Sequence, residues 1–228
     1  MVGENRFDSD SSRAARDALS RFLASAECSL DAATQDRLVD LALLLAQWGS
    51  GMNLSGYREP ESVMEGLICD GLALWFAFRE HPVFASPAEV SDLGAGAGFP
   101  GLPLAIVEPS VKVTLVESRQ RRHHFQRAAR RELALDNVQP RLGRIEELEP
   151  TLSDLVVAQA VAQPGRALEL GIPWLREGGL ILIPGNSPDL DPTPNPSIGQ
   201  SGVFSYSVLG REQARWLWWG QKTSFEAT

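Results

Sequence analysis

The spacing of apolar residues divides the chain into two stretches. In the first stretch, apolar residues recur at helical intervals and predict helices over residues 13–30, 31–48 and 59–80. Residues 1–12 are polar and acidic, which predicts a loose tail. We therefore expect an N-terminal tail and helical segment over residues 1–86.

From residue 87 onward, short β-type runs alternate with helical patterns. Five strands are predicted, at residues 89–93, 111–117, 138–142, 155–158 and 180–183. The helices between them are expected at residues 102–107, 119–133 and 167–175. Alternation of this kind gives an α/β fold, a mostly parallel sheet with helices on both faces. Residues 87–228 are therefore expected to form one domain.

The end of the chain has a different pattern. A turn is predicted at residues 178–179, and residues 184–199 hold five prolines, which predicts a mobile surface loop. Residues 204–209 and 216–219 then read as two strands of a hairpin that closes the sheet.

Three alternating glycines, Gly94, Gly96 and Gly98, lie between a predicted strand and a predicted helix. Glycine at such a turn can adopt positive φ, and it lets backbone N–H groups approach a ligand. Asp92, at the end of the strand, can meet the amino group or sulfonium of S-adenosylmethionine, whereas it would repel the pyrophosphate of NAD. Glu117 closes the next strand, where an acid accepts ribose hydroxyls in either cofactor class.

The glycine turn alone does not choose between these cofactors. Gly96, Gly98 and Gly101 also satisfy the dinucleotide pattern G-x-G-x-x-G. A nicotinamide oxidoreductase is nevertheless the weakest alternative, because of Asp92 and because Phe99 and its neighbouring proline crowd the turn.

Composition and charge narrow the class of protein further. The chain has 228 residues, of which 43% are hydrophobic, and no apolar run approaches the roughly 20 residues that span a bilayer. With no signal-peptide core after its N-terminus, it is expected in the cytoplasm without membrane contact. Cys28 and Cys69 lie far apart in predicted helices and have no metal-ligand spacing, so we expect core residues and no metal site.

A net charge of −8 conceals a local excess of positive charge. Residues 119–131 hold six arginines, two histidines and no acidic residue. A basic helix beside a cofactor site suits a polyanion such as RNA, although a solvated helix face paired with nearby glutamates would have the same composition.

The order of these parts resembles the class I S-adenosylmethionine-dependent methyltransferases. More narrowly, it resembles the RsmG (GidB) family, bacterial enzymes that methylate N7 of a guanosine in small-subunit ribosomal RNA. The likeness extends from about residue 40 to 183. It is carried by Asn53-Leu54-Ser55, by the run DLGAGAGFPGLPL over residues 92–104, by Glu117-Ser118-x-x-x-Arg122, by Asn137-Val138, and by Arg144-Ile145-Glu146-Glu147.

The resemblance implies a Rossmann-like methyltransferase fold over residues 87–228, with S-adenosylmethionine as cofactor. It implies that Gly94 and Phe99 line the methionine end of the cofactor, that Glu117 takes the ribose, and that Ile145 and Glu146 border the adenine. The full set of expected cofactor-binding residues is Asp92, Gly94, Gly96, Gly98, Phe99, Glu117, Ile145, Glu146 and Gln159.

Three positions depart from the family pattern. Gln159 stands where the family has an arginine at a strand end, Leu67 where it has a histidine, and Pro184 where it has a lysine, whereas Asp70 is kept. Guanine N7 carries an unprotonated lone pair, so its methylation needs positioning and an activated methyl donor but no general base. We therefore predict no catalytic acid or base, and an active N7-guanine methyltransferase is the leading interpretation.

The resemblance implies 16S rRNA, or the small ribosomal subunit, as partner. The predicted phosphate contacts are Arg119, Arg121, Arg122 and Arg215. One alternative is an RNA- or ribosome-binding homologue that no longer methylates, suggested by the three departures. Another is a small-molecule methyltransferase, suggested by the acidic net charge and by Trp216, Trp218 and Trp219.

Overall fold

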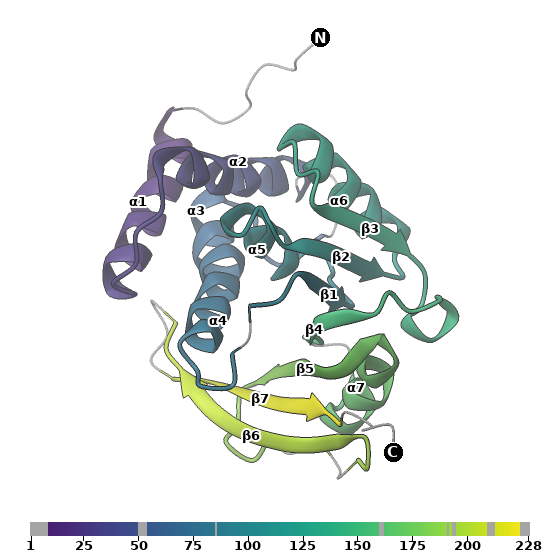
Figure 1. The fold of residues 1–228 in the computed structure, drawn as a ribbon. Coiled ribbons are helices and arrows are strands. Elements are labelled where there is room, and N and C mark those ends of the chain that lie inside the picture. The colour runs from purple at the N-terminus through teal and green to yellow at the C-terminus, as the bar shows by residue number, and fades with distance from the viewer. Residues whose placement is uncertain are drawn as a thin grey trace.

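A seven-stranded sheet forms the centre of the protein in the part of the chain that the structure describes (Figure 1). The structure is a computed structural model and describes residues 9–49, 54–84, 86–159, 162–190, 192, 195–208 and 213–223. The strand order is β3-β2-β1-β4-β5-β7-β6. The strands are β1 (Glu89–Leu93), β2 (Lys112–Glu117), β3 (Val138–Leu142), β4 (Ser153–Val157), β5 (Leu175–Gly185), β6 (Ile198–Tyr206) and β7 (Arg215–Lys222).

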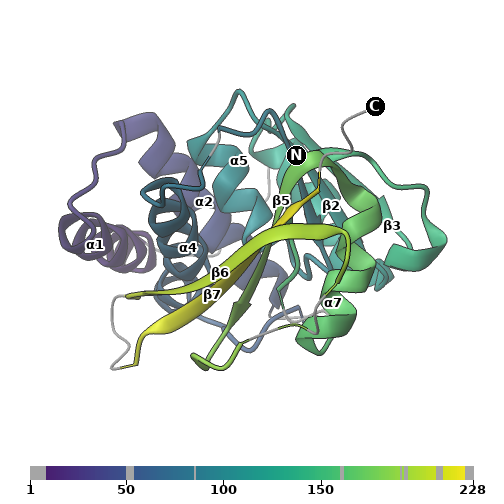
Figure 2. The same ribbon diagram turned by 60° about the horizontal axis from the view of Figure 1, so that its bottom comes forward.

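The strands β1 to β5 are parallel, and β7 is antiparallel to both β5 and β6. The predicted α/β fold with a closing hairpin is thus confirmed, although Leu209 of that hairpin lies outside the described residues. Figure 2 shows the β6–β7 hairpin beside α4 (Asp70–Arg79), where the rings of His81 and Phe204 stack with centroids 4.6 Å apart.

Helices cover both faces of the sheet. The described helical elements are α1 (Ser9–Ser25), α2 (Ala32–Gly49), α3 (Pro60–Val63), a π-helical segment (Met64–Cys69), α4, α5 (Gly101–Val107), α6 (Gln120–Glu132) and α7 (Pro164–Gly171), with short 3₁₀ turns at Ile145–Glu147 and Ile172–Trp174.

Two hydrophobic clusters lie on opposite faces of the sheet. Leu180 and Leu182 of β5 join residues of α1 to α6 in the larger cluster, whereas Ile181 and Ile183 join residues of α7 in the smaller one. This alternation is the two-residue period of a strand that is covered on both faces. The N-terminal helices share the larger core with the sheet, and the domain boundary after residue 86 stays a prediction.

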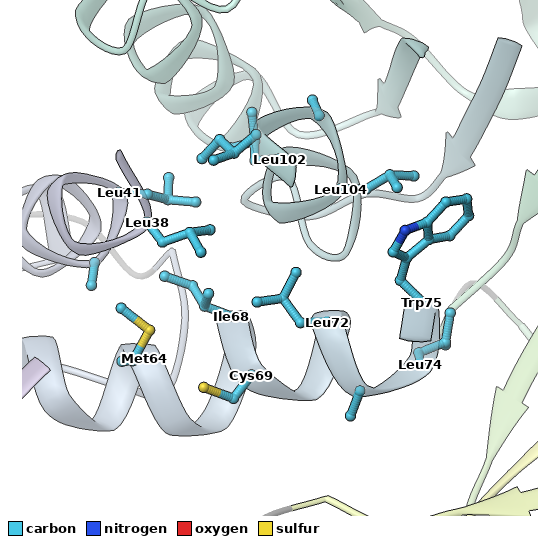
Figure 3. Packing of buried hydrophobic residues seen from close by; sticks show 14 of the residues in the cluster. Leu38, Leu41, Met64, Ile68, Cys69, Leu72, Leu74, Trp75, Leu102 and Leu104 are labelled. Atoms are coloured by element: carbon cyan, nitrogen blue, oxygen red, sulfur yellow. The ribbon is translucent and has the colours of Figure 1, made fainter. Parts of the chain in front are cut away.

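Figure 3 shows part of the larger cluster, where three helices meet. Leu38 and Leu41 of α2 face Ile68 of the π-helical segment and Leu72 of α4, with Leu102 of α5 above them. Three aromatic side chains are buried in the same cluster: Trp75, Phe76 and Phe78.

Several predicted boundaries were wrong. The first helix begins at Ser9, inside the predicted tail, and ends at Ser25. Helix α7 covers Pro164–Gly171 instead of 167–175, because Pro164 suits a first helical position and Pro173 cannot continue an α-helix.

The turn predicted at residues 178–179 was also wrong. These glycines lie within β5, which extends over Leu175–Gly185 because it pairs with β4 on one side and β7 on the other. The register of β4 and β5 shifts between Ser153 and Leu155, and Gly178 has a φ of 74°. The glycines therefore accommodate an irregular stretch of strand. Residues 184 and 185 also belong to β5, so the predicted loop begins later than expected.

Cys69 is buried in the π-helical segment, as expected for a core residue, and burial raises the pKa of its thiol to about 12. Cys28 lies just beyond α1, partly buried against the same core, so its helical prediction was wrong. Within the described ranges, no helix is long and apolar enough to cross a membrane, and no group of His, Cys, Asp and Glu side chains could hold a metal ion.

Candidate active site

The glycine turn after β1 has the backbone that its sequence predicts. Gly94, Gly96 and Gly98 all have positive φ, at 69°, 59° and 100°. The N–H of Ala95 donates to the carbonyl of Val116 at 2.9 Å, which fixes the turn at the carboxyl end of β2. A side chain at either Gly96 or Gly98 would be strained by this backbone.

Asp92 anchors the far side of the turn. Its side chain is 1% exposed, and its Oδ2 accepts a hydrogen bond from the N–H of Gly101 at 2.9 Å. A Cβ atom at Gly101 would lie 2.9 Å from the same oxygen, so this approach requires glycine. Burial raises the pKa of Asp92 to about 7. The observed contact of Asp92 is thus with the start of α5, and its contact with a ligand stays a prediction.

Two cavities lie against the glycine turn and meet at Gly94 and Arg122. The acceptor-side cavity has a volume of about 300 Å³, and its walls include Leu54, Tyr57, Leu67, Asp70, Phe99 and Gln159. The nucleoside-side cavity has a volume of about 340 Å³, and its walls include Glu117, Arg119, Arg144, Ile145, Glu146 and Arg166. Together they form one cleft at the carboxyl ends of the parallel strands, where ligands bind in open α/β sheets.

Arg122 occupies the junction of the two cavities. Its Nη1 lies 3.7 Å from Oε2 of Glu117, and its buried Nε has no hydrogen-bond partner in the part of the chain described. The other Glu117 oxygen accepts a hydrogen bond from the N–H of Arg119 at 2.7 Å. Arg122 was predicted to contact an RNA phosphate. The structure instead places it in the cleft, because its side chain points from α6 toward Glu117.

Gln126 fastens the glycine turn to α6. It is fully buried, and its Nε2 donates to the carbonyl of Gly96 at 2.8 Å. Arg122 and Gln126 are four residues apart and share one side of α6. That side of the helix therefore faces the cleft.

Arg215 is held inside the protein. Its Nη2 lies 3.4 Å from Oδ2 of Asp70, and its Nη1 donates to Oδ1 of Asn186 at 3.0 Å. The side chains of Arg215 and Asp70 are only 13% and 9% exposed. Burial lowers the pKa of Arg215, but Asp70 and Tyr206 together raise it above its ordinary value. Arg215 thus forms an ion pair with Asp70, which lines the acceptor-side cavity, and its contact with an RNA phosphate stays a prediction.

The π-helical segment shapes the acceptor-side wall. A Cβ atom at Gly66 would lie 2.3 Å from Cζ of Tyr57, so the ring of Tyr57 rests directly on this glycine. Leu67, the next residue, lines the cavity. Single-turn π-helical segments occur frequently at functional sites.

The cleft brings together most of the predicted cofactor residues. Those that line it are Gly94, Gly96, Phe99, Glu117, Ile145, Glu146 and Gln159. Gly98 lies within the turn without lining either cavity as the described residues define them, and so does Asp92 at its base. Arg119 lines the nucleoside side, whereas Arg121 is exposed on α6.

Some cleft residues had no functional role in the sequence-based prediction. Ser55 and Tyr57 belong to this group. The family match at Asn53-Leu54-Ser55 was a signal for this segment. Arg166 of α7 is another, and no local motif marks it. Pro184 lies in β5 and pairs with Leu217 of β7.

The fold is similar to those of solved methyltransferases. An O-methyltransferase from Bacillus cereus in complex with SAH superposes with a TM-score of 0.57 at 13% identity, covering 90% of this chain and 97% of that one. A putative O-methyltransferase from Klebsiella pneumoniae gives a TM-score of 0.55 at 14% identity, covering 91% and 97%. At this identity the likeness confirms the class I methyltransferase fold.

The sequence comparisons are more specific. The family model described as rRNA small subunit methyltransferase G matches residues 34–188. Ribosomal RNA small subunit methyltransferase G of Chromohalobacter salexigens is 37% identical over 157 residues, which cover 69% of this chain and 72% of the relative. The protein of the same name from Burkholderia multivorans is 36% identical over 184 residues, covering 76% and 79%. The chain therefore belongs to the rRNA small subunit methyltransferase G (GidB) family of S-adenosylmethionine-dependent methyltransferases.

Proposed function

We propose that this protein transfers a methyl group from S-adenosylmethionine to N7 of a guanosine in 16S rRNA, working in the cytoplasm on the RNA or on the small ribosomal subunit. The observation that carries the proposal is the single cleft whose two cavities meet at Gly94 and Arg122. Family membership supports rRNA methylation, and no observation favours a non-methylating homologue or a small-molecule substrate.

The cleft residues fit the cofactor in their chemistry. Glu117 would accept hydrogen bonds from the ribose hydroxyls, and Ile145 and Glu146 would border the adenine. The positive-φ turn from Gly94 to Gly98 leaves the backbone bare at the methionine end. The buried, unpartnered Nε of Arg122 supplies a cationic donor for the cofactor carboxylate, a charge that Gln159 does not provide.

The acceptor-side cavity would hold the guanine. S-adenosylmethionine, when bound, supplies a methyl group on a positively charged sulfur. Tyr57, Leu67 and Phe99 would exclude water from that side and hold the purine in line with the donor. Asp70 lines the same cavity, and its carboxylate can accept hydrogen bonds from the N1–H and amino group of guanine. These side chains position the acceptor, and none of them needs to move a proton.

The basic start of α6 would receive the RNA backbone. Arg119 lies at the rim of the nucleoside-side cavity and Arg121 is exposed beside it. No carboxylate is within ion-pair distance of either side chain among the described residues. Both guanidinium groups are therefore available to phosphate oxygens.

The test measures transfer of a radiolabelled methyl group from S-adenosylmethionine to small ribosomal subunits that lack the modification, and to RNA extracted from them. The labelled RNA is digested to nucleosides. Label in 7-methylguanosine is expected, and label in another nucleoside would contradict the proposed position. Cofactor binding without transfer to either substrate would support the non-methylating alternative. A Glu117→Gln variant should lose transfer, whereas Glu61→Gln, on the exposed surface of α3, serves as the matched control.

A further inference from the structure

A second concave surface lies on α6, outside the cleft. This groove has a volume of about 730 Å³, larger than either cavity of the cleft. Its walls include His124, Arg127, Arg130 and Arg131 of α6, together with Trp48 of α2 and Asp136. We refer to it as the α6 groove. In a chain of net charge −8, a hollow with three arginines and one carboxylate is a local positive site.

The protein neutralises the arginines of the groove only in part. Arg131 pairs with its neighbour Glu132 at 2.6 Å. For Arg127 and Arg130, no carboxylate of the described residues lies within ion-pair distance, whereas arginines elsewhere, such as Arg16 and Arg176, are paired. Unpaired guanidinium groups converging on one hollow are complementary to phosphate.

Trp48 adds an aromatic surface to the groove. Its ring is partly exposed and is supported from behind by an edge-to-face contact with Phe125, whose centroid is 5.7 Å away. An indole beside unpaired arginines is the combination that binds single-stranded nucleic acid, because bases stack on the ring while phosphates meet the cations.

The groove and the cleft are both built in part from α6. Arg119 lines the cleft and Arg130 lines the groove. Arg119 immediately precedes the first residue of α6 and Arg130 lies in its last turn, so the two are roughly 16 Å apart along the helix axis. A polyanion held at the rim of the cleft can therefore reach the groove by following α6.

We propose that the α6 groove is a second RNA-binding site, which holds a single-stranded segment that flanks the target nucleotide. In this arrangement Arg127, Arg130 and Arg131 contact phosphates and Trp48 stacks on a base. The proposal rests on rRNA being the substrate, and it assigns the groove to binding alone. Methyl transfer takes place in the cleft.

The test compares two triple variants that each remove three positive charges. One is Arg127→Gln, Arg130→Gln and Arg131→Gln in the groove. The matched control is Arg13→Gln, Arg16→Gln and Arg37→Gln on α1 and α2, which line neither groove nor cleft. Affinity for a fluorescein-labelled single-stranded fragment of small-subunit rRNA is measured by anisotropy at several salt concentrations, and S-adenosylmethionine affinity is measured in parallel.

We expect the groove variant to bind the RNA at least tenfold more weakly than the control variant in low salt. Its plot of log affinity against log salt should be shallower by about 2, since single-strand contacts contribute roughly 0.7 per phosphate. Trp48→Leu should weaken binding about fivefold or more. S-adenosylmethionine affinity should be the same in all variants, which shows that each one is folded.

Equal RNA affinity in the two triple variants would overturn the proposal and would point to an acidic protein as the occupant of the groove. Failure of the unaltered protein to bind the RNA would also overturn it. The groove and the proposed function can fail separately. RNA binding that depends on the groove, without methyl transfer, would support the groove as an RNA site and contradict the proposed function. Methyl transfer with an unchanged KM for RNA in the groove variant would support the proposed function and contradict the groove as an RNA site.

Discussion

The two cavities of the cleft meet at Gly94 and Arg122 but are built from different kinds of residue. The nucleoside side carries charged groups from four elements, including Glu117 of β2 and Arg166 of α7. The acceptor side is mostly apolar, and its carboxylate, Asp70, is paired with Arg215 below it. The difference fits the proposed function, in which one side would supply affinity through polar contacts and the other would exclude water and shape the space for the acceptor.

The largest expected effect comes from breaking the ion pair beneath the acceptor side. Arg215→Gln leaves the buried carboxylate of Asp70 without its arginine, which should lower the free energy of unfolding by about 3 kcal/mol. Denaturant unfolding monitored by tryptophan fluorescence measures the change. Adding Asp70→Asn should restore part of the loss, because the buried carboxylate is then removed. A loss below about 1 kcal/mol for Arg215→Gln would show that this side does not depend on the pair.

On the nucleoside side, Glu117→Gln should weaken cofactor binding. The amide keeps an oxygen for the N–H of Arg119 but loses the charge that strengthens bonds to ribose hydroxyls. A loss of about 2 kcal/mol corresponds to roughly 30-fold in Kd. Calorimetric titration with S-adenosylmethionine measures it, beside Glu61→Gln as control. An unchanged Kd would mean that affinity resides elsewhere in the cleft.

Asp92 lies at the base of the glycine turn, between the two sides of the cleft, and its raised pKa can be tested through the pH dependence of stability. Burial raises this pKa from 3.8 to about 7, so from pH 4 to 7 the unfolded chain releases a proton that the folded protein retains. Stability due to Asp92 is therefore highest near pH 4 and is progressively lost as pH rises to 7. Asp92→Asn cannot titrate, and its stability relative to the unaltered protein should increase by roughly 3 kcal/mol between pH 4.5 and pH 7. Parallel pH profiles would contradict the raised pKa.

The smallest effect concerns the strand-end position in the acceptor-side wall. Gln159→Arg adds a guanidinium group at a position where the family has an arginine, in the cavity that Arg122 also lines. Cofactor affinity should rise by about 1 kcal/mol, or roughly fivefold. A calorimetric titration at two salt concentrations separates a specific bond from a general charge effect. No gain would indicate that Arg122 already serves the cofactor carboxylate in this chain.

The glycine turn and the order of elements were predictable because they depend on local constraints. Glycine is the residue type that adopts positive φ readily, as Gly94, Gly96 and Gly98 do. The position of Glu117 at the end of β2 follows from the end of an apolar run. Element ends were less predictable: β5 is longer than its apolar run because it pairs on both sides. The directions of the arginine side chains were not predictable, because a composition cannot say which way a long side chain points.

The sequence by itself determined the fold class, the family and the location of the cleft, since each depends on periodicity and on short motifs. The tertiary structure alone decided that Arg122 faces Glu117 and that Arg215 pairs with Asp70, a residue 145 positions away in the chain. It also brought Trp48 of α2 beside the arginines of α6. Contacts between elements depend on how helices pack on the sheet, and local sequence does not encode that packing in any single segment.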